Sequence, residues 1–412
     1  MTINGSGAAV PVWHLTKVGL LVIAIYVLLL TPAAVLHRFD PSEFIVAGDR
    51  FVDATHLAAP IAIKRGSDGY DGQFFYRLAL APLDIAQPAE GIMLDVPAYR
   101  MQRIGYPLLA RIVALGQARW TPASLVFINL AGLAAIATLA AWLVRRHSFA
   151  WWLPLAIVAW PGFLIALTHD TAEITAAALM LGALACYLSG RLGAYGVLAA
   201  GAALTRETTI AVFVGLLAHE IRLAAMRPAV ENRWRRVLPC ALLFVPFGIW
   251  HEIVREIWHR SPQASGPQPD LGWPLVGVLA MLRANLDGTR VWVASTGVDA
   301  GIRVFVVATT SALIAFCLAV ASRLREAIRR ADRSALAAAW LPTAALMSLM
   351  TAQGPWIAPF SYFRAFTECY VLGCLVIASR PTRPRSACVW LGATGAVAVT
   401  FGNWVLCLSQ LP

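Results

Sequence analysis

The side chains best suited to chemistry gather in residues 70–79, whose sequence is YDGQFFYRLA. If this segment is helical, Asp71 shares one face with the two phenylalanines, because residues three and four positions apart lie together on a helix. A carboxylate beside aromatic rings at a membrane surface can act as a general base toward a sugar hydroxyl. Gln73, Tyr76 and Arg77 could bind hydroxyl groups or a phosphate. An amphipathic interfacial helix with Asp71 as its N-cap and an aromatic belt would show the same pattern.

Three arginines at the edges of apolar runs could bind a phosphate. Arg100 and Arg103 lie one helical turn apart, ahead of a short apolar segment, and two guanidinium groups there could clamp a phosphate through bidentate contacts. Arg364 precedes a later apolar run and is a further candidate. Arginines at such boundaries can instead extend toward lipid headgroups, so both interpretations stay open.

Two carboxylates sit between successive apolar runs. Asp170 and Glu173 are three positions apart, so they are expected to share one face of the following helix. Such a pair could orient an acceptor or bind an optional divalent cation, Mg²⁺ or Mn²⁺. Acidic residues also favour helix N-termini, and helix capping is the alternative.

Arg206 and Glu207 lie in the middle of the apolar stretch 193–218. An ionised residue deep in a bilayer costs about 2.5–3.5 kcal/mol on insertion scales, so both residues should have a partner or an aqueous cavity. Adjacent residues on a helix do not face each other, which predicts different partners for the two. A purely structural ion pair is the alternative.

The composition of the chain indicates which class of fold carries these residues. The chain has 412 residues, of which 59% are hydrophobic and 13% charged, with a mean hydropathy of +0.68. Soluble domains carry about 25% charged residues. An ordinary cytosolic enzyme, a disordered protein and a secreted disulfide scaffold are therefore excluded, and an all-α polytopic membrane protein is indicated. The net charge of +11 fits basic cytoplasmic loops and gives no reason to expect nucleic acid as a partner.

About nine apolar runs are long enough to cross a membrane. They are 18–36, 122–144, 149–168, 171–189, 237–256, 302–322, 335–352, 365–379 and 388–408. Clusters of arginine mark cytoplasmic loops, and one parity satisfies all of them only if 193–218 does not cross. We therefore expect a cytoplasmic N-terminus, an uncleaved first span and a re-entrant hairpin of two half-helices at 193–218. A straight crossing at 193–218, which would invert every later loop, is the alternative.

This topology leaves two large extracytoplasmic loops, 37–121 and 257–301. The first holds nine of the 22 acidic residues, which is more than a connector needs. The second is rich in proline and then has an apolar stretch, 275–282, that could form an interfacial helix. The first loop is therefore expected to be functional, because long structured loops usually are.

Segment 70–79, followed by Tyr106-Pro107-Leu108-Leu109, resembles the first-loop pattern of GT-C membrane glycosyltransferases. The pattern is most similar to that of the PIG-V-like mannosyltransferases and their bacterial relatives, which carry aromatic-Asp-Gly-x-x-Tyr-x-x-hydrophobic-Ala and then an aromatic-Pro-Leu block. Asp170 and Glu173 are similar to the second-loop acidic motif of that family. Residues 204–207 (LTRE) are similar to its Leu-Thr-Arg segment. The resemblance covers roughly the N-terminal half, and the C-terminal half is similar only in hydropathy.

The resemblance implies a GT-C-like fold in a bacterial inner membrane, a polyprenyl-phosphate sugar donor, and a glycan or lipid acceptor. It implies an inverting transfer at the outer face, with Asp71 as the catalytic base. Arg103, Arg206 and Arg364 would hold the charge of the leaving phosphate, the electrostatic contribution that is usually largest. Asp68 is an alternative base, because this loop carries more acids than the reaction needs.

Two other classes of function fit parts of the sequence. A transporter or lipid flippase could use Arg206 and Glu207 as coupling charges. A non-catalytic assembly protein would not need these two charges in the bilayer. The polar residues are concentrated in the outer loops rather than on both sides, which favours the membrane enzyme over the transporter.

Overall fold

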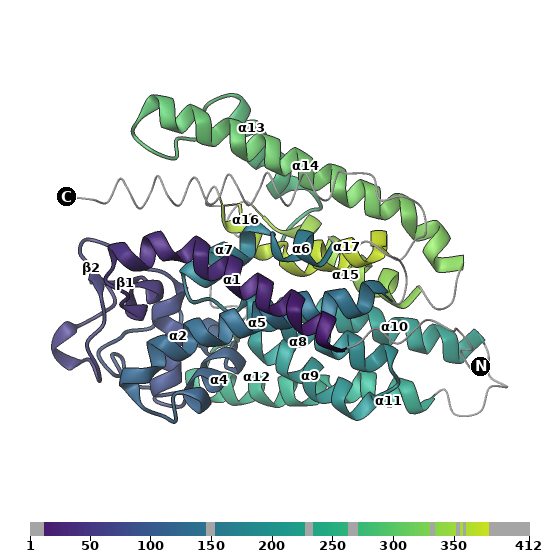
Figure 1. Ribbon diagram of the computed structural model, residues 1–412, viewed down its shortest axis with the longest axis horizontal. Helices are drawn as coiled ribbons and strands as arrows, with labels where there is room; N and C mark the ends of the chain where they lie inside the picture. The colour runs from purple at the N-terminus through teal and green to yellow at the C-terminus, as the bar shows by residue number, and fades with distance from the viewer. Residues whose placement is uncertain are drawn as a thin grey trace.

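The computed structural model describes residues 12–145, 153–226, 234–262, 271–329, 334–351, 355–356 and 360–378. In this part of the chain nearly all regular structure is helical. The expected span 388–408 lies outside the described residues. Figure 1 shows the long helices running roughly along one axis, with the segment between the first two of them folded at one end.

Five described helical stretches are long and apolar enough to cross a membrane: Thr16–Leu36, Ala118–Leu143, Glu207–Met226, Trp234–Trp258 and Thr296–Leu324. Shorter apolar helices lie among them. The all-α, multi-pass character expected from composition is thus supported, while the number of crossings stays a prediction. The helices α1 (Val12–Leu36) and α5 (Thr121–Arg145) pack against each other and flank the first loop in the sequence.

Two of the expected spans are each divided into two helices, and both contain proline, which restricts the backbone. Residues 149–168 contain α6 (Leu153–Val158) and α7 (Pro161–Thr168), with Pro161 in the first turn of α7. Residues 237–256 contain α11 (Trp234–Leu242) and α12 (Phe244–Trp258), and Pro239 lies inside α11. The remaining long elements are α8 (Glu173–Leu188), α9 (Leu192–Thr205), α10 (Ile210–Met226), α14 (Thr296–Arg329), α15 (Ser334–Leu349) and α17 (Thr367–Ala378).

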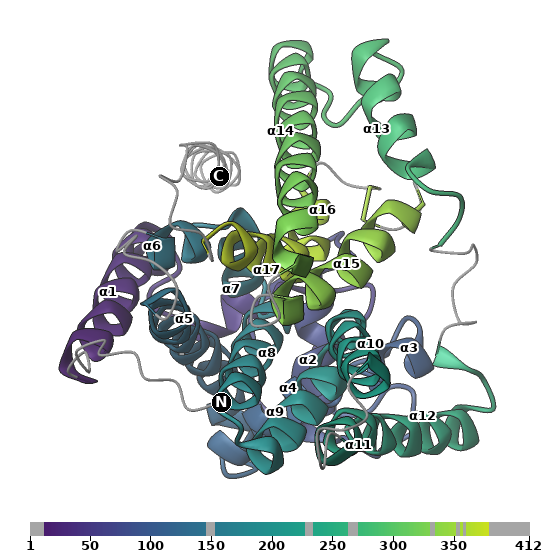
Figure 2. The same ribbon diagram turned by 90° about the vertical axis from the view of Figure 1, so that its right-hand side faces the viewer.

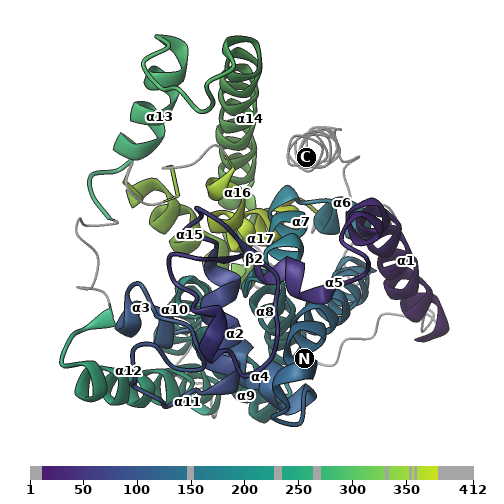
Figure 3. The ribbon, with the colours of Figure 1, turned by 90° about the vertical axis from the view of Figure 1, so that its left-hand side faces the viewer.

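The first-loop segment is built from short elements. They are β1 (Ala47–Gly48), β2 (Ile63–Lys64), α2 (Asp71–Leu80), α3 (Pro97–Met101) and α4 (Gly105–Val113), joined by irregular connections and 3₁₀ turns. The two strands pair in parallel. Figure 3, which views the molecule from this end, shows α2, α3 and β2 in front of the ends of the long helices.

The first-loop segment is held on the bundle by close backbone approaches. A Cβ on Gly72 in α2 would lie 2.5 Å from the carbonyl oxygen of His169, just after α7. A Cβ on Gly105 in α4 would lie 2.9 Å from the amide nitrogen of Thr205, at the end of α9. Only glycine permits such approaches, so these two glycines fix α2 and α4 against the long helices.

The stretch 193–218 forms two helices, α9 and α10, separated by a break at residues 206–209. Near the break, Nε of Arg206 lies 3.8 Å from Glu173 at the start of α8. Farther along α10, Glu220 accepts a hydrogen bond from the hydroxyl of Tyr187 near the end of α8. The chain therefore runs the length of α8 in α9 and returns along it in α10.

The break places Arg206 and Glu207 where α9 and α10 meet, in the middle of the stretch 193–218 as the sequence indicated. The two helices have 14 and 17 residues, comparable with the 16 of α8. At the break Glu207 contacts Arg103 of the first-loop segment. Whether either helix spans the membrane stays a prediction.

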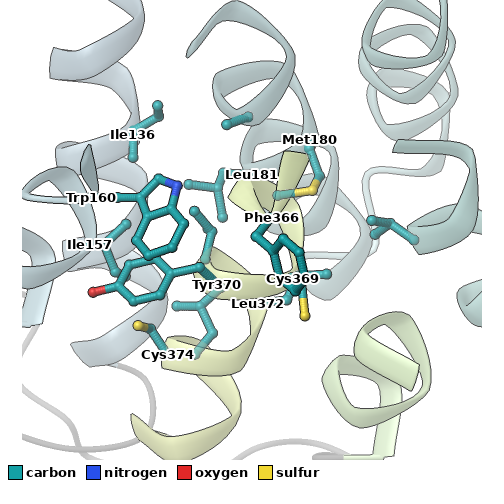
Figure 4. Close-up of a cluster of buried hydrophobic side chains, with 14 of the residues drawn as sticks. Ile136, Ile157, Trp160, Met180, Leu181, Phe366, Cys369, Tyr370, Leu372 and Cys374 are labelled. Atoms are coloured by element: carbon teal, nitrogen blue, oxygen red, sulfur yellow. The ribbon is translucent and has the colours of Figure 1, made fainter. Parts of the chain in front are cut away.

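The largest apolar core packs α16 (Ser361–Ala365) and α17 against α6, α7 and α8. Figure 4 shows its centre, where the ring of Trp160 stacks on that of Tyr370 with centroids 4.2 Å apart. The indole of Trp160 also donates to the carbonyl of Phe363 at 2.8 Å. Burial of large aromatic side chains is strongly stabilising, so this core determines where the neighbouring Arg364 and Glu368 point.

Helix α13 (Val276–Leu286) forms within the expected second loop, covering the apolar stretch 275–282. Figures 1 and 2 show α13 and α14 standing away from the other helices. The helix is therefore present as the sequence indicated, and its location at a membrane interface stays a prediction.

Candidate functional site

Asp71 is the first residue of α2, and its carboxylate faces two guanidinium groups. Oδ1 accepts a hydrogen bond from Nη1 of Arg100 at 2.7 Å, and Oδ2 accepts one from Nη2 of Arg364 at 2.8 Å. Tyr70 occupies the N-cap position and its side chain makes no capping bond. The alternative in which Asp71 merely caps the helix is therefore wrong, because both of its oxygens are used across the tertiary structure.

Ionisation of Asp71 is strongly favoured. Burial works against the charged form, but the positive charges of Arg100, Arg364 and Arg103 outweigh it and hold the pKa of Asp71 far below its usual range. The side chain is 20% exposed. The site thus contains a partly accessible carboxylate that favours its charged form and is paired with two arginines.

Arg364 links Asp71 to a more deeply buried set of charges. Nε and Nη2 of Arg364 lie 2.9 Å and 2.7 Å from the same oxygen, Oε1 of Glu173. Arg206 lies 3.8 Å from that oxygen and binds both oxygens of Glu368, at 2.8 Å and 2.9 Å. Glu173, Arg206 and Glu368 all have side chains no more than 7% exposed. Charges this buried must be paired, and here they form one continuous chain with Asp71.

The other two arginine-containing pairs flank this chain. Arg100 also makes a bidentate contact with Asp95, at 2.8 Å and 2.7 Å, and its guanidinium lies 4.5 Å from the ring centroid of Phe74. Arg103 binds Glu207, with Nε 2.8 Å from Oε2, and donates to the hydroxyl of Tyr99 at 2.6 Å. We call the eight residues Asp71, Arg100, Arg103, Glu173, Arg206, Glu207, Arg364 and Glu368 the charged cluster.

The separate partners predicted for Arg206 and Glu207 are present, since Arg206 binds Glu368 and Glu207 binds Arg103. Both contacts are ion pairs, so the alternative of a purely structural role for these charges stays open. The residues of the charged cluster come from the first-loop segment, the start of α8, the break between α9 and α10, and the helices α16 and α17. The cluster therefore joins segments from both halves of the chain.

Two residues expected to bind substrate have structural partners instead. Gln73 is fully buried; its side chain accepts from the amide of Gly48 and donates to the carbonyl of Asp68. Arg77 is also fully buried and donates to three backbone carbonyls, those of Ile92, Asp84 and Ala86. A guanidinium and an amide that satisfy loop carbonyls cannot also face a ligand, so these two assignments are corrected to loop-stabilising roles.

Tyr76 lies in the same buried layer of the first-loop segment, with no exposed surface. Burial raises the pKa of Tyr76 to about 12. A hydroxyl without exposed surface is not placed to bind a substrate, and this assignment is corrected as well. Asp68, the alternative base, is 65% exposed and pairs with the similarly exposed Arg50 at 2.9 Å, apart from the charged cluster.

Asp170 is not part of the charged cluster. It is fully buried, has a positive φ of 46°, and within the described residues neither carboxylate oxygen has a hydrogen-bond partner. Burial raises the pKa of Asp170 well above its usual range. Ala172, not Asp170, is the N-cap of α8. The expected acidic pair is thus divided: Glu173 binds arginine, while the Asp170 carboxyl has no hydrogen-bond partner among the described residues and is favoured in its neutral form.

The residues present do not fit the optional divalent cation. Within the described ranges no group of three or more His, Cys, Asp or Glu side chains is arranged to hold a metal ion. Glu173, one of the two expected ligands, has Arg364 and Arg206 beside it. Two guanidinium groups repel a cation at that position.

Sequence reasoning missed Glu368, Asp95 and Tyr99. Glu368 follows Arg364 by four positions, a spacing that places both on one helical face, and an acid at the start of an apolar run is itself a signal of function. Asp95 belonged to the acidic first loop but had no motif around it. Tyr99 directly precedes Arg100, and its contact with Arg103 follows from the i, i+4 spacing of α3 and the turn after it.

Comparison of the chain with protein-family models, with curated proteins and with solved structures gave no match.

Proposed function

We propose that the protein is a membrane glycosyltransferase that moves a sugar, such as a mannose-like hexose, from a polyprenyl-phosphate donor to a cell-envelope glycan or lipid. The observation that carries this proposal is the contact of one partly exposed carboxylate, Asp71, with two partly exposed guanidinium groups, Arg100 and Arg364. Transfer from a sugar phosphate needs one group to remove a proton and others to hold phosphate charge. The GT-C resemblance of the first-loop segment supports the same reaction.

In the proposed reaction, Asp71 takes the proton from an acceptor hydroxyl as its oxygen attacks the anomeric carbon. The bond from that carbon to the phosphate oxygen breaks, and the polyprenyl phosphate leaves with the bonding electron pair. Arg100 and Arg364 are the arginines nearest Asp71, so they replace Arg103 and Arg206 as the main groups for the leaving phosphate. Arg206, 7% exposed and bound to Glu368, positions Glu173 instead.

The test is consumption of a radiolabelled polyprenyl-phosphate mannose by the full-length protein in native-like membranes. Asp71→Asn should lower transfer by about 10²–10⁴-fold, the usual cost of losing a general base. Asp68→Asn removes one carboxylate from the same loop, at an exposed pair outside the charged cluster, and should leave transfer within about twofold. Full transfer in both variants would remove Asp71 from the mechanism.

The network of buried ion pairs also suits a transporter, in which charges exchange partners as a gate opens. Arg206 and Glu207 were the residues expected to serve as coupling charges, and each has one main partner across a helix break. The same membranes separate the two functions. A transporter would move a labelled substrate across the bilayer without releasing polyprenyl phosphate, whereas the proposed enzyme must release it.

A further inference from the structure

We propose that the contacts of Asp71 with Arg100 and Arg364 are a resting state of the site, and that the donor's phosphate displaces Asp71 from both guanidinium groups. This inference rests on the proposed function, because it assigns the displacing anion to a polyprenyl-phosphate donor. It adds a competition between base and substrate that makes the base available only when donor is bound.

The geometry of an inverting transfer requires Asp71 to move. The acceptor oxygen must attack the anomeric carbon from the side opposite the departing phosphate. The base therefore lies on one side of the sugar and the phosphate-binding groups on the other. In the structure both oxygens of Asp71 sit on the same guanidinium groups that would hold the phosphate. Base and phosphate cannot both occupy these positions, so one must leave before the reaction.

The two arginines have other anchors that keep them in place when Asp71 leaves. Arg100 is held by Asp95 through two hydrogen bonds but by Asp71 through one. Arg364 contacts Glu173 through two of its nitrogens and Asp71 through one. Asp71 is thus the least firmly attached carboxylate on each guanidinium. Displacing it leaves two oriented donors in place.

The site is also accessible to an anion at this point. The side chain of Asp71 is 20% exposed, whereas that of Glu173 is 3% exposed. Phosphate oxygens accept the same charge-assisted hydrogen bonds from arginine as a carboxylate does. The sugar phosphate is a diester with one negative charge, and the departing polyprenyl phosphate carries about −1.5 to −2. The arginines therefore bind the phosphate more strongly as the bond breaks, which favours the transition state.

Displacement also changes the strength of the base. With both arginines on it, Asp71 has a pKa far below its usual range and is a poor proton acceptor. Loss of those contacts returns the carboxylate toward the basicity of an ordinary aspartate. Without donor, the site holds its base in a paired and weakly basic form.

The experiment measures binding of polyprenyl phosphate to the full-length protein in phosphatidylcholine nanodiscs, which contain no competing anionic lipid. Asp71→Asn should bind this probe about tenfold more tightly than wild type, because the competing carboxylate is gone and the arginines remain. Asp71→Glu keeps a competing charge and should stay within about threefold of wild type. Asp71→Ser gives the same comparison if the asparagine variant does not fold.

Glu207→Gln and Asp68→Asn are the matched controls, since each removes one negative charge without freeing Arg100 or Arg364. Equal tightening in Glu207→Gln and Asp71→Asn would show a general charge effect and overturn the competition. Unchanged or weaker binding in Asp71→Asn would also overturn it. If wild type transfers sugar but Asp71→Asn binds polyprenyl phosphate no more tightly, the proposed function stands and the displacement of Asp71 is refuted. If Asp71→Asn binds more tightly but wild type transfers no sugar, the displacement stands and the proposed enzymatic function is refuted.

Discussion

Asp71 and Arg364 are 293 positions apart in the chain, and Oδ2 of Asp71 accepts a hydrogen bond from Nη2 of Arg364 at 2.8 Å. The contact joins α2 in the first-loop segment to α16 near the end of the described chain. Arg364 has this position because the neighbouring Phe363 lies in the aromatic core around Trp160. The proposed catalytic carboxylate is therefore positioned by a helix that the first-loop motif does not include.

Asp170→Asn should stabilise the protein at neutral pH. Burial raises the pKa of Asp170 in the folded state, so the unfolded state loses this proton first as pH rises above about 4. Between the unfolded pKa and the higher folded pKa, the free energy of unfolding therefore falls as the pH rises. Asparagine has no such cost and tolerates a positive φ. The gain in thermal midpoint over wild type should be larger at pH 7 than at pH 4.

Asp49→Asn is the matched pH control, because Asp49 is a first-loop carboxylate whose pKa is lowered by hydrogen bonds from Gly66 and Ser67. A lowered folded pKa gives stability above the unfolded pKa that is lost as pH falls through the folded one. Its replacement should therefore cost stability at pH 7. A destabilised Asp170→Asn variant at pH 7 would instead indicate that the ionised carboxylate has a partner.

Glu368→Gln should be among the most destabilising single substitutions in the charged cluster. Arg206, whose side chain is 7% exposed, would lose the carboxylate that accepts its hydrogen bonds through both oxygens. Breaking a buried pair on one side typically costs about 3–5 kcal/mol. Unfolding in mixed detergent micelles measures the loss. Glu252→Gln, at an exposed pair with Arg255, should change the free energy of unfolding by less than about 0.5 kcal/mol.

Gly72→Ala should displace α2 and with it Asp71. The added Cβ would lie 2.5 Å from the carbonyl oxygen of His169 and 2.6 Å from that of Ile45, and backbone atoms cannot yield without a shift of the helix. We expect a loss of about 1–3 kcal/mol in stability and a larger relative loss of sugar transfer. Gly193→Ala in α9 meets no atom within 4 Å and should be neutral or slightly stabilising. Equal transfer in both variants would argue against α2 as the carrier of the base.

Cysteine labelling should place the start of α9 and the end of α10 on the same side of the membrane, opposite the first-loop segment. Ala194 and Met226 are both exposed, and the two helices run to the first-loop segment and back. Cysteines at these positions should react with an impermeant reagent from the same side. Leu115, 82% exposed in the first-loop segment, should react from the opposite side. Labelling of Ala194 and Met226 from different sides would support a straight crossing and invert the later loops.

Composition and periodicity were enough to indicate an all-α membrane protein, because the free energy of burying apolar side chains in a bilayer depends on run length and little on tertiary detail. The same local reasoning found Asp71 and the arginines, since ionised residues next to apolar runs are costly and therefore informative. It also predicted different partners for Arg206 and Glu207. These conclusions depend on neighbours within one or two helical turns.

The tertiary structure alone decided which charges meet. Gln73 and Arg77 look like ligand-binding groups in the sequence but satisfy backbone carbonyls, because burial forces each polar group to find a partner. Asp170 and Glu173 share a motif but have opposite environments, because a positive φ turns the chain between α7 and α8. Glu368 became part of the site only through packing of α17 against α8. Pairing of buried charges depends on contacts between distant segments, which local sequence patterns do not contain.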